Sequence, residues 1–533
     1  MKYIYAQFFT PLLLIFSLLS PNLSLGQSVK MTPLLGVGED GDLSLGAERR
    51  MGDAIAKQIY RDPDYLDDPL LNEYVDSSWQ SLLKAARAKG ELTTEMDERF
   101  AWRVMLARDR TVNAFALPGG YFGVHLGLIG LVANQDELAS VLAHELTHVT
   151  QRHISRSITQ QGRQTPVMIA AMILGAVAAR KSPDGVSAVI AGSQAVAIQG
   201  QLNFSRDMER EADRLGLGLM QPAGFAPQGF VGMFEKLQQS ARLSDSGNFP
   251  YLRSHPMTTE RMGDMQQRLL IQQHMAKYAP QNEPTLQHAM MGARARVLAE
   301  PGIDVLRQWA AEPQATGFVN LSKSRQVASL YAAILSNIKL RDFARANMQN
   351  DRLNSSVIGD LVALKATKLI AIELQLAANN ADVALTLLPI QAAGQRLSRP
   401  ELFAQSQVQI ASKQAAQQPG LAALAVQNLQ AWVAANPTDA PAWQLLGNAY
   451  RATGQNLRAL RAEAEAQVAL LDYAASIDRF KAAQDMVRSG SAPTNAGQNT
   501  GRDYMEESII DVRTRQVQEL LKQQIKDEKD AAK

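Results

Sequence analysis

The stretch VLAHELTHVTQRH, residues 141–153, places three histidines and a glutamate among leucines and valines. On a helix, His144 and His148 are four residues apart, so both side chains emerge from the same face one turn apart. Both imidazoles can then reach one ion at the ~2 Å that Zn–N bonds require. Glu145 projects beside such an ion, where it can take a proton from a metal-bound water. The pattern therefore describes a mechanism for hydrolysis as well as a spacing.

This spacing alone leaves two interpretations open, because an amphipathic helix can carry the same residues by accident. A catalytic zinc needs a third protein ligand and one open position. A third histidine at short spacing is absent, since Ile154 stands six residues beyond His148. The best candidates are Glu209 and Asp213, one turn apart in the motif EREAD. Glu209 can bind the metal while Asp213 holds the second nitrogen of a ligand histidine.

A solvated charged face is the alternative for the same EREAD motif. Glu211 fits that alternative. The apolar flanks NF and LGLGLM favour the metal site for Glu209 and Asp213.

The composition of the chain limits the number of structural units, the partners and the kinds of metal ligand that can be expected. The chain of 533 residues is too long for one core and predicts three or four structural units. Its 54 basic and 52 acidic side chains nearly cancel, which gives no electrostatic case for binding nucleic acid. It has no cysteine, so any metal must be held by histidine and carboxylate side chains.

The N-terminus predicts export. One lysine precedes an apolar run at about Phe8–Leu19, and Ser24 and Gly26 have the spacing of a cleavage site. A retained membrane anchor is the weaker alternative, because the run is shorter than the ~20 residues that span a bilayer. We expect a signal peptide over residues 1–26 and cleavage before Gln27.

The first domain is expected to end near residue 275. Residues 27–100 are predicted to be mainly helical. The stretches WRVMLA and YFGVHLGLI, with the turn signal LPGG between them, predict a small sheet with a hairpin. Asn134 is expected to start the helix of the HELTH motif, with Glu137 as its capping-box partner. Two apolar segments at about 166–199 predict buried helices or a hairpin that faces lipid or substrate.

From about residue 285 helical blocks alternate with short breaks, and their period in the mid-thirties predicts a helical solenoid over 285–487. In the clearest unit, Trp443, Leu446, Gly447 and Tyr450 have the spacing of a tetratricopeptide repeat. Residues 488–533 are expected to form a linker and a polar, solvated helix.

Four motifs in this order resemble the M48 zinc metallopeptidases: NAFALPGG, HELTH, EREAD and SHPMTTER. The signal peptide and the repeats resemble the periplasmic branch of that family. The resemblance implies a mainly α chain. A zincin-like α+β peptidase domain with a small sheet over 27–275 would precede a TPR-like solenoid.

The resemblance also implies roles for individual residues. One zinc ion would bind His144, His148 and Glu209, with Glu145 as general base and Asp213 as a supporting or proton-donating acid.

Three further elements would surround that metal site. His255 would face the metal, either stabilising the oxyanion or occupying the fourth zinc position as a reversible plug. Arg261 would assist the tetrahedral intermediate. The strand of Asn113, Ala114, Phe115 and Ala116 would be an edge to which extended substrate adds.

As a whole, the resemblance implies a periplasmic zinc endopeptidase that degrades misfolded or stalled outer-membrane β-barrel proteins and supports their assembly. Its repeats would bind substrate or the β-barrel assembly machinery, with peripheral membrane contact and no nucleic acid. The alternative is a TPR scaffold or chaperone whose self-plugged metal site is mostly silent. A hydrolase of the cell wall has no supporting motif.

The remaining histidines are assigned no chemistry. His153 is expected to lie at the surface, off the ligand face. His125, His274 and His288 are expected in the core or at the surface.

Overall fold

The computed structural model describes residues 43–160, 206–243, 249–273, 283–299, 301–389, 396–489 and 500–531. The expected signal peptide, the apolar segments at 166–199 and His274 lie outside the described residues.

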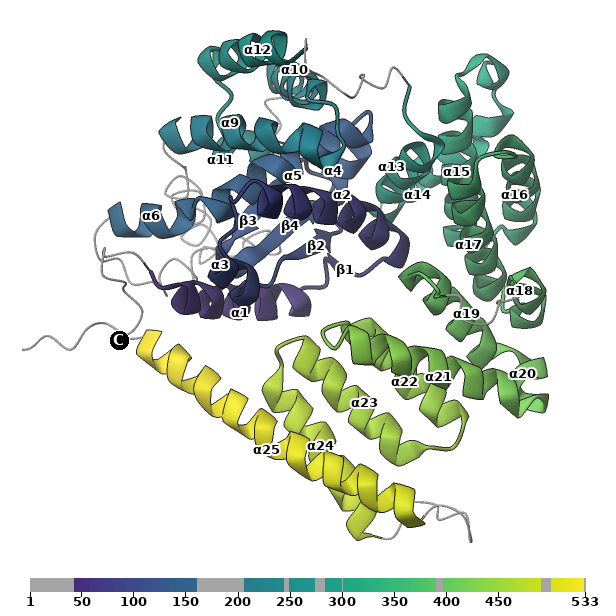
Figure 1. Cartoon of the computed structure of the whole chain (residues 1–533). Helices are drawn as coiled ribbons and strands as arrows, with labels where there is room; N and C mark the ends of the chain where they lie inside the picture. The colour runs from purple at the N-terminus through teal and green to yellow at the C-terminus, as the bar shows by residue number, and fades with distance from the viewer. Residues whose placement is uncertain are drawn as a thin grey trace, which may run out of the picture.

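The first half of the chain surrounds a four-stranded sheet with helices (Figure 1). Its strands are β1 Tyr65–Leu66, β2 Arg103–Ala107, β3 Ala114–Leu117 and β4 Tyr121–His125, in the order β1-β2-β4-β3. The helices are α1 Leu45–Arg61, α2 Pro69–Ala88, α3 Thr94–Arg99, α4 Leu126–Leu131, α5 Gln135–Thr150, α6 His153–Gln160, α9 Arg206–Ala223, α10 Gln228–Leu243, α11 Pro250–Ser254 and α12 Thr259–Gln273.

The predicted hairpin is present between β3 and β4, which are antiparallel and joined by the 3-10 turn η1 Pro118–Gly120. β2 pairs with β4 in parallel. The predicted strand over YFGVHLGLI is too long, because the chain turns into α4 after His125. That turn buries Leu126, Leu128 and Ile129 within the main hydrophobic core.

α5 begins where the sequence predicts. Asn134 is its N-cap, and its side chain accepts a hydrogen bond from the Glu137 backbone N–H at 3.0 Å. The reciprocal bond differs from the prediction, because the Glu137 carboxylate accepts from the N–H of Ala133 at 2.6 Å. The apolar side of α5 is buried, with Leu138 and Leu142 each no more than 1% exposed.

The second half consists of helices packed in antiparallel succession, as the alternating blocks predict (Figure 1). They are α13 Leu286–Leu298, α14 Ile303–Ala311, α15 Lys323–Lys339, α16 Phe343–Ser356, α17 Leu361–Ala377, α18 Ala381–Leu387, α19 Arg399–Ala411, α20 Lys413–Gln417, α21 Pro419–Ala435, α22 Ala440–Ala452, α23 Asn456–Ala469 and α24 Tyr473–Arg488, with 3-10 turns η2 Glu312–Gln314 and η3 Phe318–Asn320. A Cβ at Gly447 would lie 3.5 Å from Ala459 O, which is ordinary van der Waals contact, so Gly447 lies on the side of α22 that faces α23.

One hydrophobic cluster spans the boundary between the two halves. Trp79 of α2 packs on Phe122 of β4 with ring centroids 4.1 Å apart. The same cluster of buried side chains continues to Met290 on α13 and Tyr331 on α15. The first helices of the second half are thus built onto the first half.

The last helix, α25 Thr500–Ala531, runs along α24 and back toward α1 (Figure 1). It was expected to be solvated, but Ile510 and Val517 are no more than 1% exposed and pack against the neighbouring helices. At its far end Gln524 accepts a hydrogen bond from Lys57 Nζ of α1 at 3.0 Å. The end of the described chain is therefore tied to its first helix.

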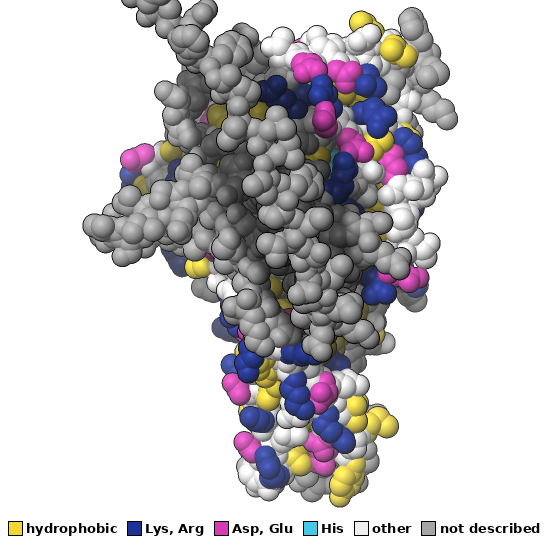
Figure 2. Space-filling model, turned by 90° about the vertical axis from the view of Figure 1, so that its left-hand side faces the viewer, with side chains coloured by type: hydrophobic (Ala, Val, Ile, Leu, Met, Phe, Trp, Pro, Cys, Tyr) yellow, Lys and Arg dark blue, Asp and Glu magenta, His cyan; other side chains and the backbone are white. Residues whose placement is uncertain are grey.

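Surface charge is mixed on the face shown in Figure 2, where basic and acidic side chains alternate among the described residues. None of the helices that the structure describes is both long and apolar enough to cross a membrane.

Candidate metal centre

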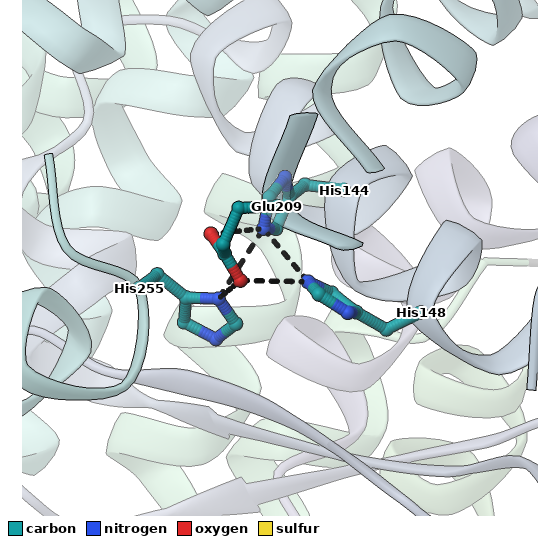
Figure 3. A group of neighbouring side chains, drawn as sticks. All are labelled: His144, His148, Glu209 and His255. Atoms are coloured by element: carbon teal, nitrogen blue, oxygen red, sulfur yellow. Dashed lines mark hydrogen bonds and ion pairs between the residues drawn. The ribbon is translucent and has the colours of Figure 1, made fainter. Parts of the chain in front are cut away.

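Four side chains of the first half converge at one point: His144, His148, Glu209 and His255 (Figure 3). One ligand atom from each lies within 4.8 Å of all the others, and all four residues are buried. His144 and His148 approach from one side and His255 from the other. The predicted ligands are thus brought together, and His255 joins them.

The distances between these atoms fit a small divalent metal ion. Four ligands around zinc at Zn–N distances of 2.0–2.1 Å would lie about 3.3 Å from one another. His144 Nε2 lies 3.0 Å from His148 Nε2 and 3.3 Å from His255 Nδ1. Glu209 Oε1 lies 2.9 Å from His255 Nδ1 and 3.4 Å from His148 Nε2.

The position of Glu209 depends on how closely α9 packs on α5. A Cβ at Gly216, on α9, would lie 3.2 Å from the Ala143 carbonyl oxygen on α5 and 3.1 Å from the Phe230 ring. A larger residue at Gly216 would push α9 outward. The glycine therefore lets the carboxylate of Glu209 reach the histidines of the facing helix.

Asp213 and Arg261 lie behind His144. Asp213 Oδ1 is 3.0 Å from His144 Nδ1, which is the supporting contact that the sequence predicts. Arg261 of α12 donates to both oxygens of Asp213 at 2.6 and 2.7 Å, and its Nη1 lies 2.7 Å from Glu209 Oε2. Arg261 is 4% exposed. Its guanidinium neutralises two buried carboxylates, and its expected role in the tetrahedral intermediate stays a prediction.

Glu145 is buried beside the cluster and 1% exposed. Its two carboxylate oxygens accept no hydrogen bond from the residues that the structure describes. His255 Nε2 lies 3.4 Å from Glu145 Oε1, and the Tyr251 ring packs on His255 with centroids 4.7 Å apart. The Glu145 oxygens are thus placed where they can accept a hydrogen bond from a molecule bound at the cluster.

Among these side chains, burial and charge have opposing effects on the pKa values. Burial lowers the pKa of His144, but its contacts with Asp213 and Glu209 outweigh burial and raise that pKa to about 9. Burial holds the pKa of His148 well below its usual value. Burial would raise the pKa of Glu209, but His255 and the other two histidines keep it well below the usual range. The cluster thus pairs an anionic carboxylate with imidazoles.

His153 is not at the surface, which corrects the sequence prediction. It is fully buried, and its Nδ1 lies 2.9 Å from Nδ1 of His148. Its Nε2 lies 3.1 Å from Glu211 Oε2, so Glu211 is not a purely solvated residue either. Burial lowers the pKa of His153 to about 4 despite that contact.

The other described histidines have structural contacts. His288 lies between the Tyr74 hydroxyl at 2.6 Å and the Val132 carbonyl at 3.0 Å. His125, at the end of β4, contacts the Thr111 hydroxyl at 2.9 Å.

β3 is the terminal strand of the sheet and contacts α5. The N–H of His125 donates to Asn113 O at 3.0 Å. In an antiparallel ladder hydrogen-bonded pairs alternate, so the backbone groups of Ala114 and Ala116 point away from β4. The expected substrate strand therefore presents two alanine backbones at the sheet edge.

Comparison with known proteins points to the same region. Residues 69–269 match the family described as Peptidase family M48. A beta-barrel assembly-enhancing protease of Escherichia coli is 27% identical over 466 residues, which is 87% of this chain and 89% of that protein.

Two further relatives match over shorter stretches. A Vibrio cholerae protein of similar name is 33% identical over 317 residues, 59% of this chain and 61% of that protein, so the match spans less than two thirds of it. A mitochondrial metalloendopeptidase of Saccharomyces cerevisiae is 28% identical over 198 residues, 36% of this chain and 54% of that protein.

Proposed function

The chain carries a metallopeptidase domain of family M48 over residues 69–269, and from this premise we propose that it is a zinc-dependent endopeptidase of the bacterial periplasm. Its substrates would be outer-membrane β-barrel proteins that have misfolded or stalled during assembly. The names of the Escherichia coli and Vibrio cholerae relatives support this substrate class. The apolar N-terminal run supports export.

One observation carries the proposal. Two imidazoles from one helix meet a carboxylate from another, and an adjacent glutamate lies with its oxygens buried. Buried polar groups without partners are costly in a protein interior. The arrangement is accounted for when a metal and a water molecule take part in it.

The residues divide the chemistry among them. His144, His148 and Glu209 would hold a zinc ion, which would supply the Lewis acidity needed to activate water and polarise the scissile carbonyl. Glu145 accepts the proton of the attacking water and passes it to the leaving amine. His255, 3.4 Å from Glu145, donates to the developing oxyanion.

Substrate would bind in extended form along β3. Because Ala114 and Ala116 direct their backbone groups away from β4, a peptide can pair with them by β-strand addition and lie beside α5. Main-chain pairing is largely independent of sequence, which suits an enzyme that removes misfolded proteins.

This binding mode can be tested with Ala116→Pro. Proline removes the outward N–H of Ala116 while leaving the bonds to β4 in place. We expect a higher KM for an unfolded protein substrate with unchanged metal content. Phe115→Pro is the matched control for the ladder itself, because the N–H of Phe115 faces β4; it should destabilise the fold. An unchanged KM for Ala116→Pro would exclude pairing at this position.

The helical second half is proposed to be a TPR-like docking domain. Its support is the packing of α23 against the side of α22 that carries Gly447, where the spacing of Trp443 and Tyr450 fits a tetratricopeptide unit. Helical solenoids present extended surfaces to other proteins. Unfolded outer-membrane proteins and the assembly machinery are the partners that this surface would serve.

The decisive experiment compares Glu145→Gln with the wild type on casein. Glutamine has nearly the same volume, and the Glu145 oxygens accept no hydrogen bond from the described residues, so fold and metal content should be retained. Loss of a general base should lower kcat by roughly 10²–10⁴-fold. Glu260→Gln, at an exposed position of α12, is the control and should keep full activity. A Glu145→Gln variant that cleaves at the wild-type rate would refute the mechanism.

A second candidate function is a scaffold or chaperone whose metal site is mostly silent. It is favoured by His255, whose Nδ1 lies within the same cluster as the three expected ligands and would fill the open position. His255→Ala separates the two functions. Proteolysis above the wild-type level would identify His255 as a plug, whereas proteolysis below it would identify a catalytic group.

A further inference from the structure

The two histidines of the HELTH motif are supported in different ways. His144 Nδ1 faces the carboxylate of Asp213 at 3.0 Å, and Arg261 holds that carboxylate in place. His148 Nδ1 instead faces a second imidazole, with 2.9 Å to Nδ1 of His153 and the rings 75° apart. His148 is therefore not supported by a carboxylate directly, as His144 is, but by a second histidine, His153.

Beyond His153 the chain of contacts ends at an ion pair. His153 Nε2 lies 3.1 Å from Glu211 Oε2, and the same oxygen lies 3.0 Å from Arg156 Nη1. The His153 side chain has no exposed surface, whereas that of Glu211 is 28% exposed. Glu211 and Asp213 are two residues apart on α9, so one helix supplies the supporting carboxylate for both histidines.

The direction of each hydrogen bond follows from the donors available. A neutral imidazole has one N–H and one acceptor nitrogen. If His148 presents its Nε2 lone pair to the cluster, its proton is on Nδ1 and must be donated to His153 Nδ1. His153 then carries its proton on Nε2, where it is donated to the carboxylate of Glu211.

The opposite direction of the hydrogen bond between His148 and His153 is inconsistent with the other contacts of both rings. A proton on His153 Nδ1 would turn its Nε2 into an acceptor facing the Glu211 carboxylate at 3.1 Å. It would also place the His148 proton on Nε2, which points at His144 Nε2 from 3.0 Å and would block an ion. The geometry is satisfied only when His148 is in the tautomer that binds metal.

We propose that His153, held by Glu211, is a positioning residue that fixes the tautomer and ring orientation of His148 for metal binding. This inference rests on the proposed function, since it concerns the same metal site. Partners that orient a ligand histidine typically change metal affinity by about 10–100-fold when they are removed.

The test measures the zinc dissociation constant of the full chain by competition with a chelating dye. His153→Phe keeps the ring volume but removes both hydrogen bonds, and it should weaken zinc binding by about 10–100-fold. His153→Asn retains an acceptor oxygen close to the position of Nδ1 and should recover most of the affinity. Glu211→Ala, at a partly exposed position, should weaken binding less than His153→Phe.

His288→Phe is the matched control, because His288 is a buried histidine with two hydrogen bonds that lies outside the cluster. It should bind zinc as the wild type does. The inference would be overturned if the wild type and His153→Phe bound zinc with equal affinity. It would also be overturned if His153→Asn, or His288→Phe, lost as much zinc affinity as His153→Phe. Failure of the wild type itself to bind zinc would instead refute the proposed function.

Discussion

The buried ion pair between Asp68 and Arg294 joins the start of α2 to α13. Arg294 donates to both oxygens of Asp68 at 2.8 and 2.6 Å, and the two side chains are only 7% and 6% exposed. Asp68 also accepts from the Leu71 N–H as the N-cap of α2. Asp68→Asn keeps a good cap and removes the charge, so it isolates the contribution of the ion pair.

Loss of one partner of a buried pair costs about 3–5 kcal/mol, because the other charge stays buried. Glu373 Oε2 still lies 2.8 Å from Arg294 Nη1 and compensates in part. We therefore expect a cost at the lower end, about 3 kcal/mol. Since every 1.4 kcal/mol is a factor of ten, the amides of α13 and of the first turns of α2 should exchange roughly 10²-fold faster.

Hydrogen exchange followed by mass spectrometry on the full chain measures the local unfolding that exposes these amides. The variant that carries both Asp68→Asn and Arg294→Met has no uncompensated charge and should recover much of the protection. Asp304→Asn removes an exposed pair with Arg307 on α14 and should leave exchange unchanged. Less than a fivefold increase in α13, or an equal increase in α23 and α24, would refute the reasoning.

Three further outcomes are expected. Gly229→Ala should lower thermal stability by about 1–3 kcal/mol through overpacking, because its Cβ would lie 2.3 Å from Asp136 O. Gly263→Ala, at an exposed position of α12 with nothing within 4 Å, should not lower it, and a Gly229→Ala variant as stable as the wild type would contradict the close packing of α10 on α5. Burial lowers the pKa of His288, so the folded chain binds fewer protons than the unfolded chain below a pH of about 6.5, and stability falls as the pH drops through that window. His288→Gln should show a shallower loss between pH 7.5 and 5.5 in thermal denaturation, and an equal or steeper loss would contradict this sign. Zinc at 100 times its dissociation constant should stabilise the chelator-treated protein by about 2.7 kcal/mol, and a melting temperature unaffected by zinc would argue against a folded metal site.

The local sequence pattern predicts which side chains meet at the candidate site. The spacing of His144 and His148 and the cap at Asn134 depend only on helical geometry, and the structure has them as predicted. Glu209 was found because catalysis requires a third ligand. The sequence pattern does not predict how closely α9 packs on α5. That packing depends on Gly216, which lies against Ala143.

The boundary between the two halves was less predictable. A change in composition near residue 285 indicates a new unit, but helices rich in alanine and leucine carry no information about what they pack against. The structure places Arg294 on Asp68, and Arg399 of α19 on Asp67 at 2.8 Å. Two adjacent aspartates before α2 thus hold two separate helices of the second half.

His153 shows where helical periodicity misleads. At 100° per residue, a residue five positions after His148 would point about 140° away on a continuous helix. α5 ends at Thr150, however, and Arg152 adopts a left-handed backbone conformation with φ of 54°. α6 then starts at His153 in a new direction, which returns its ring to His148. A non-glycine residue in this conformation needs compensation, and Arg152 obtains it from Glu48, whose carboxylate lies 3.3 Å from its Nε. The contact of His153 with His148 of the candidate metal site therefore depends on a break in the helix that the residue types of QRH do not predict.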